Sequence, residues 1–189
     1  YTELYTSEGV TNMHQVLDSV STRATPAMNA SLNASYTGEE VKTTLFHMFP
    51  TKAPGPDGFP THFFQKHWDI CGDEVTKAVI RILHGEESVE CINNTYLVRI
   101  PKVKSPTSLA QFRPISLCNV LYNIASKVVA NRLKEILPDI ISSEQSAFVP
   151  GRLITDNILM AYECLHFMKR NKALKHRSCA LKLDMMKAY

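Results

Sequence analysis

Residues 112–138 read FRPISLCNVLYNIASKVVANRLKEILP, and this stretch joins two different patterns. Its beginning, residues 112–117, is rich in β-branched and aromatic side chains, which is typical of a strand. From Asn119 to Leu137 the apolar side chains recur on one side of a helix, and we expect Pro138 to end that helix. The stretch therefore predicts a strand that leads directly into a long amphipathic helix.

A second strand is expected immediately upstream. Residues 95–103, TYLVRIPKV, have the same strand-like composition, and Pro101 suits an edge strand because it cannot donate to a neighbouring strand. Residues 104–108, KSPTS, are typical of a turn. Together with residues 112–117 they predict a β-hairpin with a basic tip.

The segment before the hairpin predicts helices. Thr37 and Glu40 have the spacing of a capping box, in which each residue bonds the backbone amide of the other. We expect a helix from there to about Met48, with an apolar side made of Val41, Leu45 and Met48. Residues 53–60, APGPDGFP, contain three prolines and two glycines, so they predict a shaped loop rather than a helix or a central strand.

Residues 61–84 have helical periodicity, and we predict two helices with a break near Cys71 and Gly72. The side chains expected to be buried are Phe63, Phe64, Trp68, Ile70, Val75, Val79, Ile82 and Leu83.

Beyond the long helix, residues 142–151 are rich in turn formers, and a helix is expected from Thr155 or Asp156 to about Asn171. Residues 178–184 alternate as a strand would. Residues 1–36 are polar and predict a lead-in segment with one short helix. Helices with few strands and no alternating βαβ pattern predict an α+β fold.

Composition limits the class of protein. A chain of 189 residues with 44% hydrophobic content can form one domain, or most of one. Five widely spaced cysteines without a Cys-x-x-Cys pair suit a reducing compartment better than a disulfide framework or a zinc site. No apolar run approaches the roughly 18 residues that span a bilayer, and no leader opens the chain. We therefore expect an intracellular protein, nuclear or cytoplasmic, that is neither secreted nor bound to a membrane.

Two groups of residues are candidates for chemistry. Asp184 follows an apolar strand, where a carboxylate can hold Mg²⁺ against substrate phosphates, although aspartates also commonly cap turns at strand ends. Lys102 and Arg113, on the hairpin, could hold a triphosphate, although two basic residues on a hairpin are often only solvated. The net charge of +3 permits a nucleic-acid partner but does not indicate one.

The order of five segments adds a resemblance to these patterns. They are TKAPGPDG at 51–58, IPK at 100–102, FRPISLCN at 112–119, QSAFVPGR at 145–152 and LDMMKAY at 183–189. This succession resembles the sequence blocks of reverse transcriptases of the LINE type, the retrotransposons without long terminal repeats. The residues of the blocks are most similar to those of plant elements. The resemblance covers residues 37–189, the N-terminal part of a reverse transcriptase domain, while residues 1–36 resemble the segment that precedes it.

The resemblance implies the fingers and the first palm strand of a right-hand polymerase, with an RNA template, a DNA primer, deoxynucleoside triphosphates and Mg²⁺ as ligands. On it, Asp184 matches the first catalytic, metal-binding aspartate, Lys102 and Arg113 match positions that contact the incoming triphosphate, and Tyr189 lies against the sugar. The residues expected near template and nucleotide are Gln145, Phe148, Gly151 and Arg152.

The chain departs from the family in lacking the second carboxylate block, an aromatic residue followed by x-Asp-Asp. Two-metal catalysis needs more than one carboxylate, so we expect an incomplete domain whose remainder belongs to a retrotransposon polyprotein, and an isolated chain that does not polymerise. Two alternatives stay open. One is a non-catalytic, nucleic-acid-binding relic of such an element, and the other is a translation product without a role.

Overall fold

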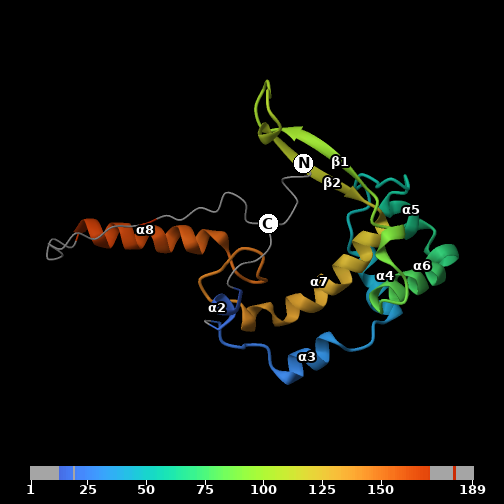
Figure 1. The fold of residues 1–189 in the computed structure, drawn as a ribbon, viewed down its shortest axis with the longest axis horizontal. Helices are drawn as coiled ribbons and strands as arrows, with labels where there is room; N and C mark the ends of the chain where they lie inside the picture. The colour runs from blue at the N-terminus through green and yellow to red at the C-terminus, as the bar shows by residue number, and fades with distance from the viewer. Residues whose placement is uncertain (1–12, 19, 171–180, 182–189) are drawn as a thin grey trace. The chain divides into compact units, whose positions relative to one another are not determined.

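The computed structural model describes residues 13–18, 20–170 and 181 (Figure 1). It has two compact units, Tyr1–Glu135 and Ile136–Tyr189. The elements of the first unit are α2 (Met13–Leu17), α3 (Pro26–Leu32), α4 (Gly38–Phe46), α5 (Thr61–Lys66), α6 (Trp68–Leu83), the short 3₁₀ helices η1 (Val89–Cys91) and η2 (Leu109–Gln111), β1 (Thr95–Pro101), β2 (Phe112–Cys118) and most of α7 (Val120–Ile140). The second unit holds the end of α7 and α8 (Ile154–Arg170). The predicted mixture of helices with one hairpin is confirmed.

Helix α4 begins as predicted. The Thr37 amide donates to Glu40 Oε2 at 2.8 Å, and the Glu40 amide donates to Thr37 Oγ1 at 3.2 Å, which completes the capping box. The expected apolar side is buried, with exposed fractions of 0%, 0% and 7% for Val41, Leu45 and Met48. The helix ends at Phe46, two residues before the predicted limit.

The core of the first unit lies between α4, α5, α6 and the first half of α7, which Figure 1 shows gathered beside one another. Each helix contributes side chains three or four residues apart, because that spacing lines one face of a helix. The buried members are Val41, Leu45, Met48, Phe64, Val75, Val79, Val120, Ile124, Ala125 and Val128.

The break between α5 and α6 falls at His67, so the predicted break near Cys71 and Gly72 is wrong. Gly72 lies inside α6, where a Cβ atom would come within 2.7 Å of the Trp68 ring. The glycine therefore allows the indole to pack against the helix backbone and does not interrupt the helix. A glycine chosen for close packing and a helix-breaking glycine look alike in sequence.

Two residues of the predicted buried set are exposed. Ile70 is 83% exposed and Phe63 is 37% exposed, whereas Phe64, Val75, Val79 and Ile82 are buried as expected. Ile70 precedes Val75 by five residues, which is about 140° around a helix of 3.6 residues per turn. It therefore points away from the face that packs on the core.

The predicted hairpin is confirmed. Strands β1 and β2 are antiparallel, with Thr95 opposite Cys118 and Pro101 opposite Phe112, and Figure 1 shows them as a two-stranded ribbon. Every residue of β1 is exposed, including the apolar Tyr96 and Leu97.

The loop of residues 53–60 is fixed against Asn119, the residue between β2 and α7. The Asp57 amide donates to Asn119 Oδ1 at 3.2 Å, and Asn119 Nδ2 donates to the Ile92 carbonyl at 3.3 Å. Gly55 is buried there, and a Cβ atom on it would lie 2.5 Å from both Asn119 N and Asn119 Oδ1. One amide side chain thus joins the loop, the start of the hairpin and the start of α7.

Helix α7 continues past Pro138 to Ile140, so the expectation that Pro138 ends it is wrong. Proline lacks a backbone donor, yet the Ile141 amide still bonds the Leu137 carbonyl at 3.0 Å. The Arg152 guanidinium donates to the carbonyls of Pro138 at 3.0 Å and Ile141 at 3.3 Å. These charged donors satisfy carbonyls at the helix end, which supports the additional turn.

Helix α8 confirms the helix expected after residue 155, and none of its residues is buried. The strand expected at 178–184 lies outside the described residues, apart from residue 181.

Helix α3 was not predicted, although Thr25 followed by Pro26 is a helix-start signal: the Met28 amide donates to Thr25 Oγ1 at 3.2 Å. Among the described helices, none has the length and apolar character needed to cross a membrane.

Arg132 of α7 joins the lead-in segment to α4. Its guanidinium forms a two-point ion pair with Glu40, at 2.7 and 3.0 Å, and lies 3.9 Å from the centre of the Tyr36 ring. It also donates to the carbonyls of Leu32, Ala34 and Ser35. The Arg132 hydrogen bond is the main reason that the pKa of Glu40 is lowered to about 2.

We predict that Arg132→Met lowers the free energy of unfolding by about 3 kcal/mol, because it leaves a partly buried carboxylate and three backbone carbonyls without their donor. Arg132→Lys should cost about 2 kcal/mol, since an ammonium cannot form the same two-point contact. Urea denaturation followed by circular dichroism measures both. Arg81→Met is the control, because Arg81 makes only exposed, long ion pairs at 3.8 and 4.0 Å and should cost less than about 0.5 kcal/mol. Equal losses for Arg81 and Arg132 would contradict this account.

The Glu40 pKa predicts a pH dependence. Because the folded-state pKa is about 2 and the ordinary value is 4.5, the ionised carboxylate stabilises the fold fully above pH 4.5 and progressively less as the pH falls toward 2. Allowing for solvent screening at this partly exposed pair, the loss should be about 1–2 kcal/mol. Glu40→Gln should remove this part of the pH dependence. If the free energy of unfolding of Glu40→Gln falls between pH 5 and pH 2 as much as that of the unmodified chain, the pH dependence does not come from Glu40.

We also predict that Gly55→Ala destabilises the fold by about 2–3 kcal/mol, because the methyl group would overlap the Asn119 backbone and side chain. Gly58→Ala is the matched control in the same loop. Gly58 has φ of 74° and open space around it, so its cost should be confined to about 1 kcal/mol of backbone strain. Thermal denaturation of both variants tests the difference, and a larger loss for Gly58→Ala would count against close packing at Gly55.

Candidate nucleotide and nucleic-acid site

Lys102 directly follows β1 and lies at the far end of the hairpin. Its amide donates to the Gln111 carbonyl at 2.7 Å, and its Nζ donates to the Ala110 carbonyl at 3.0 Å. The side chain is exposed, so the bond to Ala110 can exchange for a stronger, charge-assisted bond to an anion.

Arg113 lies on β2, opposite Ile100, and is also exposed. Since Lys102 bonds the backbone of Gln111, two residues before Arg113, the hairpin places both cations near its turn. An ammonium and a guanidinium at one end of a β-hairpin are suited to binding a polyphosphate. The structure therefore brings these two predicted residues to the same place.

Gln145, Phe148, Gly151 and Arg152 lie in one loop of the second unit. Arg152 donates to the carbonyls of Ser142 and Gln145, the latter at 2.7 Å, in addition to the two carbonyls at the end of α7. This guanidinium thus holds the loop in shape from within. The sequence indicated a residue near the template, and the observed contacts are those of a residue that positions its neighbours.

Phe148 is almost fully exposed in this loop. Its exposed fraction is 97%, and its φ of 65° is a conformation that a bulky residue rarely adopts. Gly151 has φ of 78°, and Gln145 Nε2 donates to the Ala147 carbonyl at 3.2 Å. The loop therefore presents an aromatic ring to solvent on a strained but well-bonded backbone.

Asp184 and Tyr189 lie outside the described residues, and so does the rest of the fifth sequence block. Within the described part of the chain there is no group of three histidine, cysteine, aspartate or glutamate side chains that could hold a metal ion. The role of Asp184 as a metal ligand therefore stays a prediction.

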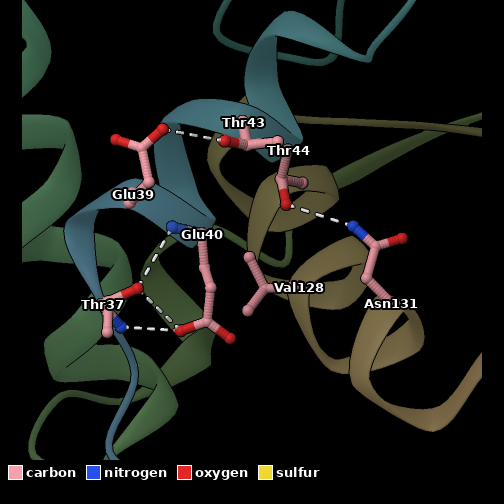
Figure 2. A pocket seen from close by; sticks show the side chains of 7 residues that line it. All are labelled: Thr37, Glu39, Glu40, Thr43, Thr44, Val128 and Asn131. Carbon is pink, nitrogen blue, oxygen red and sulfur yellow. Dashed lines mark hydrogen bonds between the residues drawn. The ribbon is translucent and has the colours of Figure 1, made fainter. Parts of the chain in front are cut away.

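A pocket of about 250 Å³ lies between α4 and α7, and Figure 2 shows the side chains that line it. Glu39 accepts from the Thr43 hydroxyl at 3.2 Å, and Asn131 Nδ2 donates to Thr44 Oγ1 at 3.3 Å. Glu40 is engaged in the capping box and with Arg132. The Asn131–Thr44 bond and the Arg132–Glu40 ion pair join the two helices, and the other bonds lie within or at the start of α4, so these polar groups serve the packing.

Comparison with known proteins identifies a family for the part of the chain that holds the hairpin's second strand and the loop. Residues 100–189 match the family model described as reverse transcriptase (RNA-dependent DNA polymerase). The matched region contains Lys102, Arg113, the loop of residues 145–152 and Asp184.

A curated relative extends the similarity toward the N-terminus. The chain is 33% identical, over 159 residues, to the transposon TX1 uncharacterized 149 kDa protein of Xenopus laevis. The aligned region covers 84% of this chain but only 12% of that relative. The predicted resemblance is confirmed at the level of the family, while its closer similarity to plant elements stays a prediction. Residues 100–189 of this chain therefore belong to the reverse transcriptase family, and the chain as a whole is similar to a transposon protein.

Proposed function

We propose that the protein containing this chain copies an RNA template by extending a DNA primer with deoxynucleoside triphosphates. The observation that carries this proposal is the family match over residues 100–189, which includes every candidate site residue. The relative matched by the chain is a transposon protein several times longer, and this supports a larger polyprotein as the setting. The odd number and wide spacing of the cysteines favour action inside the cell, in the nucleus or the cytoplasm.

The hairpin supports a role in holding the incoming nucleotide. Phosphoryl transfer depends mainly on positioning and on neutralising the charge of the phosphates. Lys102 can supply a mobile point charge, and Arg113 can supply a two-point contact from the opposite strand. We infer that both contact the triphosphate, and that Tyr189 lies against its sugar.

The loop of residues 145–152 supports a role beside the template and the nucleotide. We infer that the exposed Phe148 ring offers a surface on which a base can stack, a contact that does not depend on base identity. Gln145, Gly151 and Arg152 would keep the ring in place, because their contacts lie within the loop.

Reverse transcriptases in general depend on Mg²⁺, which neutralises phosphate charge and lowers the barrier to attack by the primer hydroxyl. We infer that Asp184 is the catalytic aspartate that binds the metal. Further carboxylates are needed beside it, since a two-metal site requires more than one acidic ligand.

We predict that Lys102→Ala and Arg113→Ala each raise the KM for deoxynucleoside triphosphate by about 10- to 100-fold, because each removes a charge-assisted contact to phosphate. Asp184→Asn should abolish primer extension. The measurement is steady-state extension of a DNA primer on poly(rA) by the polymerase that contains this chain. Lys104→Ala, on the same hairpin, is the matched control and should change the KM less than about twofold.

Two outcomes would contradict the proposal. Equal effects of Lys104→Ala and Lys102→Ala would reduce the hairpin to a general basic surface. Retained RNA binding without any primer extension, in a protein with an intact Asp184, would favour the non-catalytic relic.

A further inference from the structure

A second hollow of about 420 Å³ lies on the first unit, and none of its lining residues is among those proposed for the nucleotide. Its walls come from the segment that follows α4 and from one face of α7. On α7 the lining positions are spaced by three or four residues, as one helix face requires. The lining residues are Met48, Phe49, Lys52, Asn123, Ser126, Lys127 and Ala130.

Lysines gather at this hollow. Lys127 Nζ donates to the His47 carbonyl at 3.2 Å. The pKa of Lys127 is lowered, first by partial burial and then by the positive charges of Lys134 and Lys52. Lys134 follows Lys127 by seven residues, which places it two turns farther along the same face of α7. The ammonium groups of Lys52 and Lys134 thus both lie close enough to Lys127 to repel it, and none of the seven lining residues is acidic.

Phe49 lies at the same hollow and is 73% exposed. An exposed aromatic side chain beside clustered cations is the combination found where proteins bind single-stranded nucleic acid: cations contact the phosphates, and bases stack on the ring.

Helix packing explains only part of this arrangement. Lys127 caps the negative end of α4 by its bond to the His47 carbonyl, which is a common use of a lysine. That role does not require Lys52 or Lys134, whose charges make the position of Lys127 less favourable. It also does not require an exposed ring at Phe49.

We propose that Lys52, Lys127 and Lys134, together with Phe49, form a binding surface for a single strand of nucleic acid, with phosphates on the lysines and a base on the ring. This surface uses none of the hairpin or loop residues assigned above. The choice of nucleic acid over other polyanions rests on the proposed function. The expectation that the ligand is negatively charged rests on the positions of the lysines.

The test measures binding of oligo(U) of about 15 nucleotides to the 189-residue chain by fluorescence anisotropy at several salt concentrations. For single strands, the slope of log affinity against log salt is about 0.7 per phosphate neutralised. Replacing all three lysines by glutamine should therefore reduce the slope by about 2. Phe49→Ala should weaken binding about tenfold, and Phe49→Tyr should preserve it because the ring remains.

The matched control replaces Lys42, Lys66 and Lys77 by glutamine. These lysines are exposed on α4, α5 and α6, so the variant has the same net charge as the test variant. Its slope should stay close to that of the unmodified chain. Because Lys127 also supports α4, the double variant Lys52→Gln with Lys134→Gln provides a second measurement that spares this contact, with an expected decrease of about 1.4 in the slope.

Three results would overturn the proposal. They are an equal loss of slope in the control variant, the absence of any oligo(U) binding by the folded chain, and equally tight, equally lysine-dependent binding of a poly-glutamate peptide. These results are distinguishable from failure of the proposed function, which is read from the KM effects of Lys102→Ala and Arg113→Ala in primer extension.

Discussion

The contact between Arg132 and Glu40 is the constraint on which the arrangement of the first unit depends. Glu40 already caps α4 from within, and Arg132 extends from the second half of α7 to bind the same carboxylate at two points. The guanidinium also bonds carbonyls of the segment between α3 and α4. A single planar cation thereby fixes where α4 begins and how the preceding chain approaches it, while Val41, Leu45 and Val128 pack in the core that α4 and α7 share.

The other end of α7 is fixed by Asn119. Its amide side chain bonds the loop before α5 and the segment before β1, and Gly55 approaches it more closely than any residue with a Cβ atom could. The hairpin leaves the core at this point, so its base is hydrogen-bonded to the loop and to the start of α7. Such support favours a function based on positioning, because phosphate-binding groups must be held in place before the nucleotide arrives.

Three arginines of this chain illustrate how context separates structural from functional side chains. Arg132 and Arg152 both donate to several backbone carbonyls, and each stabilises a chain segment next to a helix end. Arg113 instead lies exposed on a strand, near the turn where Lys102 is also exposed. These contacts favour the proposed ligand contact for Arg113 and a positioning role for Arg152, a difference that residue type alone does not reveal.

The sequence by itself determined the local elements and the family. The capping box at Thr37 and Glu40, the strand composition before and after residues 104–108 and the apolar face of α7 depend on neighbouring residues, so each could be predicted. The order of the five motif blocks indicated the family and its site residues, and the family match confirms the former.

Only the tertiary structure decided how distant residues use those elements. Gly72 accommodates the Trp68 ring instead of breaking a helix, and α7 passes Pro138 where Arg152 satisfies carbonyls at its end. The lysine surface combines Lys52 with Lys127 and Lys134, which lie about 75 and 82 positions later in the chain. The seven-residue spacing of Lys127 and Lys134 places them on one face of α7, but it does not show that Lys52 lies beside that face. The physical reason is common to these cases: burial, charge and hydrogen-bond satisfaction depend on which segments meet, and a linear pattern records only what is near in the chain.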